Sequence, residues 1–256
     1  MFGRLFSGIV AVAVLAPAVW TQTADEIIAK NIQARGGADK LKSVQSVKST
    51  GTTAMGPGME APGLLIQKRG NLARLELTIQ GLTAVQAYDG KNAWQVMPFM
   101  GKKDPELMSA DETKEVEEMA DLDGPLVDYK SKGNRVELLG KEKIEGTDAY
   151  KLKVSLKNGD VQTVYIDADS FLEIKEETKR TVRGSEQVFE SAIGDYKEVN
   201  GIMFPFAIES GVKGSPEKQK LTITKIELNV PADDSIFKMP AAPPAPAPAK
   251  TEAPKN

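Results

Sequence analysis

From Val47 onward the chain contains segments in which apolar and polar side chains alternate with a period of two. This pattern is typical of antiparallel strands that have one face in the core and the other in water. The apolar positions of three such segments are Leu75, Leu77 and Ile79; Tyr150, Leu152, Val154 and Leu156; and Ile202, Phe204, Phe206 and Ile208. We therefore expect about ten or eleven antiparallel strands.

Turn residues between the segments support this interpretation. Asp89-Gly90, Asn158-Gly159 and Asn200-Gly201 are dipeptides that tolerate positive φ, and each is flanked by strand-like runs. In the last strand Leu221 and Ile223 share one face, whereas Ile226 and Leu228 fall on the other. A β-bulge near Thr224 or Lys225 would restore the register and curve the sheet.

Two segments have helical patterns, each opened by a capping box. The first box is Thr23 to Glu26, and it predicts a helix over residues 24–35 that ends at Gly36-Gly37. The second box is Ser109 to Glu112, and it predicts a helix over about residues 110–121. Short helical turns are expected at residues 38–44 and 125–129.

The order of these elements predicts a mainly β (α+β) fold. One strongly curved antiparallel sheet, or an unclosed β-barrel, of about 10–11 strands would be covered on its concave face by two helical elements that act as a lid. We find no internal repeat and no domain linker, so a single domain is expected over residues 23–239.

The two ends differ from this domain. Residues 1–22 contain Arg4 and an apolar stretch from Leu5 to Trp20, which is shorter than the ~20 residues of a membrane-spanning helix and is typical of a secretory signal peptide. Ala16 and Ala18 form the best cleavage site and Ala24 is a second choice; the alternative is an uncleaved anchor. Residues 240–256 are rich in Pro and Ala, and we expect this tail to be disordered. We therefore expect the protein to be exported to the periplasm.

Composition excludes several classes of chemistry. The 256 residues include no Cys and no His, so disulfides, thiolate nucleophiles, Cys/His metal sites and Ser-His-Asp triads are ruled out. The net charge of −3 is spread along the chain and forms no basic patch for nucleic acid. Two acidic segments, residues 121–124 and 167–170, lack the full spacing of a calcium loop, and a helix end and a turn explain them better. We expect no catalytic residue, cofactor or metal.

Methionines cluster in two loops, at residues 55–59 (MGPGM) and 97–100 (MPFM). Thioethers are ligands for Cu(I), and methionine also lines adaptable apolar surfaces. Copper binding, a flexible apolar rim of the barrel and ordinary loop packing are the alternatives for these loops.

Several short motifs together resemble a known family. They are a first helix that ends in Gly36-Gly37, residues 87–90 (AYDG) followed by Trp94, residues 164–167 (VYID), residues 195–202 (DYKEVNGI) leading to Phe204-Pro205, and residues 234–237 (DSIF). In these motifs the chain is similar to the outer-membrane lipoprotein-sorting (LolA/LolB-like) superfamily of periplasmic proteins. The resemblance covers about residues 24–238. It implies an unclosed β-barrel with a helical lid over a hydrophobic cavity, which holds acyl chains and catalyses no reaction.

The inward-facing apolar positions of the strands are the candidate ligand-lining residues. They are Leu75, Leu77, Ile79, Leu152, Val154, Leu156, Phe204, Phe206 and Ile208. A filled core and a lipid pocket use the same residue types, so the pattern leaves both alternatives open.

Two function classes follow from the sequence. The first is an exported, non-enzymatic carrier that binds an acyl chain, a lipid or a lipidated protein. The second is a structural or adaptor protein of the cell envelope that acts through contacts with other proteins. We expect a monomer in either case.

Overall fold

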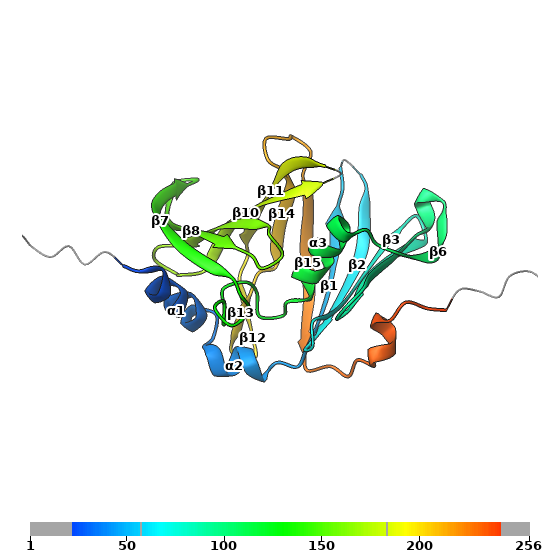
Figure 1. Ribbon diagram of the computed structural model, residues 1–256, viewed down its shortest axis with the longest axis horizontal. Helices are drawn as coiled ribbons and strands as arrows, with labels where there is room; N and C mark the ends of the chain where they lie inside the picture. The colour runs from blue at the N-terminus through cyan, green and yellow to red at the C-terminus, as the bar shows by residue number, and fades with distance from the viewer. Residues whose placement is uncertain (1–21, 57, 183, 242–256) are drawn as a thin grey trace, which may run out of the picture.

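A computed structural model describes residues 22–56, 58–182 and 184–241 (Figure 1). The signal peptide expected at residues 1–22 and the tail expected at residues 240–256 therefore lie almost wholly outside the described residues. Within the described ranges, thirteen strands form one antiparallel sheet in the spatial order β6-β5-β4-β3-β2-β1-β15-β14-β11-β10-β9-β8-β7. The edge strands β6 and β7 are not paired with each other, so the curved sheet is an unclosed barrel.

The described residues form fifteen strands, more than the ten or eleven expected. In the large sheet their bounds are β1 (Ser46–Ala54), β2 (Glu60–Lys68), β3 (Leu72–Ile79), β4 (Leu82–Asp89), β5 (Ala93–Met97), β6 (Lys102–Leu107), β7 (Arg135–Ile144), β8 (Thr147–Ser155), β9 (Val161–Asp167), β10 (Glu173–Val182), β11 (Ser185–Gly194), β14 (Ala207–Val212) and β15 (Gln219–Leu228). A separate hairpin is made of β12 (Lys197–Val199) and β13 (Ile202–Phe204).

The prediction of one continuous strand was wrong. Residues 202–208 were predicted to form a single alternating strand, but the pairing breaks at Pro205 and Phe206, between β13 and β14. Pro205 has no amide hydrogen for a ladder, and the Phe206 amide instead donates to the carbonyls of Gly194 and Asp195 at 3.2 and 3.1 Å. The chain therefore leaves one hairpin and enters the large sheet at this point.

The predicted turns and bulge are confirmed. Each of the three dipeptides closes a hairpin, and Asn200 and Gly201 both have positive φ, 53° and 78°. In the pairing of β1 with β15, Thr50 lies opposite Lys225 and Gly51 opposite Ile223, so Thr224 is the extra residue of a bulge. Its hydroxyl donates to the Thr50 carbonyl at 3.0 Å.

The helices begin where the capping boxes predict. They are α1 (Ala24–Ala34), α2 (Ala38–Ser43) and α3 (Ala110–Ala120), with short 3₁₀ turns η1 (Pro98–Met100) and η2 (Asp234–Phe237). Both capping boxes are formed. Residues 125–129 form a turn without a helix, and this turn buries Leu126 and Val127. Within the described ranges we find no helix that is both long and apolar enough to span a bilayer.

Gly36 ends α1 for a steric reason. Its φ is +123°, and a Cβ there would lie 2.4 Å from the Gly201 carbonyl oxygen of the β12–β13 hairpin. Arg35 accepts a hydrogen bond at its carbonyl from the Met203 amide of the same hairpin, at 3.0 Å. Glycine is therefore required where α1 contacts this hairpin.

Helices α1 and α3 cover different parts of the concave face (Figure 1). Ile27 and Ile28 of α1 pack with Leu126 on the buried side chains of β8 and β9. Val116 and Ala120 of α3 pack on Ala73, Tyr88 and Ala93 of β3, β4 and β5. The expected two-element lid is present, with one apolar anchor on each half of the sheet.

Ser109 at the start of α3 offers a direct test of the second capping box. The Glu112 amide donates to its hydroxyl oxygen, and the Ser109 amide donates to the Glu112 carboxylate at 2.9 Å. We expect Ser109→Ala to lower the free energy of unfolding by about 1 kcal/mol, measured by urea titration. Ser185→Ala, an exposed strand position, should change it by less than about 0.5 kcal/mol. Equal stabilities of the two variants would contradict the role of the cap.

Candidate functional site

An apolar groove of about 400 Å³ runs along the concave face between β3, β2, β1, β15 and β14. Its walls are apolar side chains with a few hydroxyls and amides, and none of the lining residues carries a charge. The apolar lining residues are Val47, Leu64, Leu65, Leu75, Leu77, Met119, Phe204, Pro205, Ile208, Leu221, Ile223 and Ile226. Pockets that bind small apolar ligands have this composition and reach volumes of about 300–1,000 Å³.

The groove exists because two glycines leave its floor without side chains. Gly51 of β1 and Gly63 of β2 are a cross-strand pair, and Gly63 is paired in turn with Leu77 of β3. At Gly51 a Cβ would lie 2.5 Å from the Thr222 carbonyl oxygen, so glycine is needed for the close approach of β15 near the bulge. At Gly63 a Cβ would make ordinary contacts at 3.6 Å with the Leu77 side chain. Gly63 therefore leaves part of the groove floor without a side chain, at a position where a Cβ would fit without a clash.

The predicted ligand-lining residues divide between this groove and a packed core. Leu75, Leu77, Phe204 and Ile208 line the groove. Leu152 and Val154 are fully buried under α1, and Leu156 packs at the edge of the same cluster.

The two remaining residues lie elsewhere. Phe206 is buried among Leu41, Val44 and Val127, below the groove wall. Ile79 is half-buried at the end of β3 and is outside the groove lining. The filled-core and open-cavity alternatives thus describe two different halves of the same sheet.

Sequence reasoning missed several groove residues. Leu65 lies in the uninterrupted apolar run Leu64-Leu65-Ile66, so the sequence pattern does not show which of these side chains faces the core. In the structure Leu65 pairs with Leu75 on one side and Ser49 on the other. Leu221 and Ile223 were known to share a face, but the bulge decides which face that is. Met119 comes from α3, whose position over the sheet no local pattern reveals.

On the other side of α3 a buried ionic cluster connects the helix to β9 and β10. The Arg180 guanidinium donates to the Glu118 carboxylate at 2.9 Å and lies 3.6 Å from Asp160, and Lys114 pairs with Asp160 at 3.4 Å. Burial raises the pKa of the Glu118 carboxyl to about 7, against the opposing effect of Arg180. This cluster is the polar counterpart of the apolar anchor of α3.

The acidic segments have structural partners. Arg69 donates to both carboxylate oxygens of Asp123, at 2.7 and 2.9 Å, and Lys132 donates to Asp121 at 2.6 Å. Asp167 accepts from the Asp169 and Ser170 amides in a turn. Asp121 lies at the C-terminal end of α3 and residues 168–170 form a turn, which are the local structures expected for these segments. Across the described ranges, no group of three or more Asp or Glu side chains is placed to hold a metal ion.

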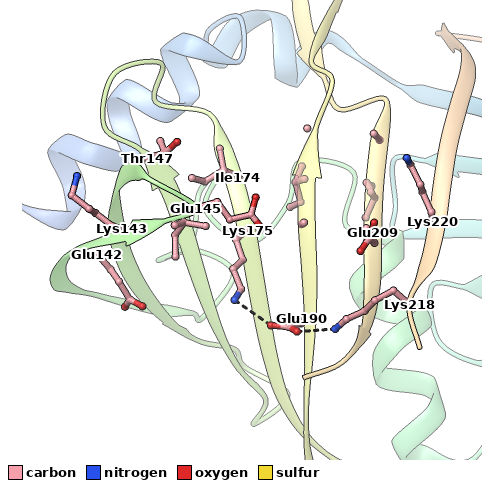
Figure 2. A pocket seen from close by; sticks show the side chains of 16 residues that line it. Glu142, Lys143, Glu145, Thr147, Ile174, Lys175, Glu190, Glu209, Lys218 and Lys220 are labelled. Carbon is pink, nitrogen blue, oxygen red and sulfur yellow. Dashed lines mark hydrogen bonds and ion pairs between the residues drawn. The ribbon is translucent and has the colours of Figure 1, made fainter. Parts of the chain in front are cut away.

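A second hollow, of about 790 Å³, lies on the convex side between the β7–β8 hairpin and β10, β11, β14 and β15 (Figure 2). Three of its charged side chains pair with one another: Glu190 lies between Lys175 and Lys218, at 3.1 and 2.7 Å. Hydrogen bonds from these lysines hold the pKa of the Glu190 carboxyl at about 2. Because many of its lining residues are charged, this hollow suits an apolar ligand less well than the groove does.

The two methionine loops are separate turns of the sheet. Met55 and Met59 belong to the β1–β2 hairpin, and Met97 and Met100 to the β5–β6 connection. Three strand spacings separate β2 from β5, or about 14 Å. The topology therefore favours an apolar rim over a single cluster of thioether ligands.

No family model matches the sequence, and neither does any curated protein. Solved structures do match the fold. A LolA superfamily protein from Nitrosomonas europaea has a TM-score of 0.57 at 16% identity, over 85% of this chain and 98% of that one. A DUF1329 family protein from Desulfovibrio piger has a TM-score of 0.58 at 12% identity, over the same shares.

A third structure, a putative outer membrane lipoprotein-sorting protein domain from Vibrio parahaemolyticus, has a TM-score of 0.53 at 13% identity, over 82% of this chain and 94% of that one. The three matches extend over most of the described domain and over nearly the whole of each matched structure. With its unclosed thirteen-stranded sheet and helical lid, the chain has the LolA-like fold.

Proposed function

We propose that this protein is an exported, non-enzymatic carrier that binds one long apolar chain in the concave groove. The observation that carries the proposal is the uncharged groove of about 400 Å³ between β3 and β14, with Gly63 in its lining. The name of the Vibrio structure, a lipoprotein-sorting domain, supports a lipid or a lipidated protein as the ligand class. In this proposal Leu75, Leu77, Phe204 and Ile208 contact the ligand directly.

The energetics of burial suit a carrier. Burying a hydrocarbon chain gains about 0.8 kcal/mol per CH₂, so a twelve-carbon chain gains roughly 10 kcal/mol. Association costs of order 4–15 kcal/mol offset much of this gain. Binding would then be reversible, as delivery to a second partner requires. In this proposal burial of the apolar chain drives binding, and no metal or cofactor takes part.

Leu152, Val154, Leu156 and Phe206 have a supporting role in the proposal. They pack against α1, α2 and the turn at residues 125–129, and so hold the strands in their curved arrangement. Ile79 lies toward the open end of the groove, at the last residue of β3.

The proposed location is the periplasm, reached by a signal peptide that is cleaved within or just after residues 1–22, with the tail at residues 240–256 left outside the domain. Mass spectrometry of the protein from an envelope fraction should find a mature N-terminus between Val19 and Asp25. Retention of Met1 would favour the anchor. Sedimentation of the mature chain should show a monomer.

The test of the carrier proposal is the lipid content of the purified protein. We expect extraction and mass spectrometry to find about one acyl chain for each protein molecule that retains its ligand. Protein stripped of lipid should bind a fluorescent fatty-acyl probe, and unlabelled fatty acid should displace the probe. If the protein carries no lipid and binds no probe, the adaptor alternative replaces the carrier.

A further inference from the structure

Three neighbouring turns at one end of the sheet expose apolar side chains. Hairpins β1–β2 and β3–β4 and the β5–β6 connection all turn at the same end, because the strands between them are antiparallel neighbours. In Figure 1 this end faces away from α2 and the β12–β13 hairpin. The exposed fractions are 48% for Met59, 46% for Leu82, 42% for Phe99 and 66% for Met100. We call these four residues the apolar rim.

The turns at the apolar rim also differ in charge from other turns of the molecule. Residues 55–59, 80–81 and 98–101 read MGPGM, QG and PFMG, without a charged side chain. Other hairpin turns place Arg69, Lys91, Glu145 or Lys157 at their tips. The first charges beside the rim are Glu60 on one side and Lys102 and Lys103 on the other, and all three are exposed. A group of exposed apolar side chains at one edge of a protein indicates an interaction surface, whereas single exposed apolar side chains are common and do not.

The groove reaches this same end of the sheet. Thr53, one residue before the end of β1, and Leu77, two residues before the end of β3, both line it. A ligand that leaves the groove along the strands therefore emerges between the β1–β2 and β3–β4 turns. This continuity favours a surface from which an apolar chain can pass directly into the groove.

We propose that the apolar rim docks on a lipid bilayer, with its side chains inserted at the boundary between headgroups and acyl chains. Phe99 and the methionines suit this boundary, because they are large, apolar and, for methionine, flexible. Lys103 lies beside the inserted turn, where its ammonium group meets lipid phosphates, and the neighbouring Lys102 also pairs with Glu106 at 2.6 Å. The rim contacts are separate from the groove walls, so docking does not depend on occupancy of the groove.

Flotation with vesicles of phosphatidylethanolamine and phosphatidylglycerol tests the proposal. The soluble form of the exported chain, with its C-terminal tail retained, should float with the vesicles. In the double variant Phe99→Ser/Met100→Ser, the coefficient for partition from water to the vesicles should be lower by roughly tenfold or more. The control Leu139→Ser removes a side chain that is 52% exposed on the opposite edge strand β7, and it should float as the parent does.

Two further measurements separate this proposal from the carrier function. The double variant should still unfold in one cooperative thermal transition, and its probe binding without vesicles should equal that of the parent. Absence of flotation by the parent chain overturns the docking proposal, and so does undiminished flotation of the double variant. Concentration-dependent self-association that the double variant abolishes, without vesicle binding, would overturn it in favour of a second copy of the chain.

Discussion

Gly63→Leu is expected to weaken the binding of an acyl probe strongly while the protein stays folded. The position has no positive φ, and its Cβ would lie 3.6 Å from both the Glu76 carbonyl oxygen and the Leu77 side chain. The new side chain therefore projects from the floor into the groove without a backbone clash. A leucine there occupies a large part of about 400 Å³ and removes the straight path along the strands. We expect the probe affinity to fall by roughly a hundredfold, the equivalent of about three or four displaced CH₂ groups.

Gly194→Leu is the matched control for this variant. Gly194 also lies in a strand, its φ is not positive, and a Cβ there meets nothing within 4 Å. It lines the hollow on the convex side, so the same substitution changes the opposite face of the sheet. Fluorescence titration of both variants should give full affinity for Gly194→Leu. Equal affinity of the two variants would show that the probe binds outside the groove.

The sequence predicted the local elements better than the spaces between them. Capping boxes, hairpin dipeptides and the bulge at Thr224 are determined by residues close to one another in the chain, and each is found near its expected position. The break at Pro205 was missed because the alternation from Ile202 to Ile208 continues through it. That alternation belongs to two strands with different partners.

The groove itself depends on pairing between distant strands. Leu65, Leu75 and Ile223 meet only because β3, β2, β1 and β15 are consecutive neighbours in the sheet. The open floor requires Gly51 and Gly63 to be paired, and nothing in either segment alone reveals this register. Leu152 and Leu75 have similar alternating surroundings in the sequence, yet α1 covers one and leaves the other beside the groove. Local patterns identify an inward face, whereas tertiary packing decides where that face is filled.

The ionic cluster under α3 predicts that stability falls as the pH rises through neutrality. In the folded protein burial raises the pKa of Glu118 to about 7, from 4.5 for an ordinary glutamate. Between these two values the folded protein keeps a proton that the unfolded chain has released. A group with a raised pKa in the folded state stabilises below the unfolded pKa, and this contribution is lost as the pH rises through the folded pKa. The expected loss between about pH 4.5 and pH 8 is about 3 kcal/mol as an upper limit.

Glu118→Gln should remove most of this pH dependence, because the amide is neutral throughout and has the shape of the protonated acid. At pH 8 we expect the variant to be more stable than the parent by about 2–3 kcal/mol, and near pH 4.5 the two should be nearly equal. Urea titrations at several pH values measure both. Glu115→Gln on the same helix is the control: its side chain is 73% exposed and lies 4.0 Å from Arg180, so its stability curve should follow that of the parent. Parallel curves for Glu118→Gln and the parent would mean that Arg180 keeps the carboxylate ionised, and α3 would then be held to β10 by a permanent ion pair.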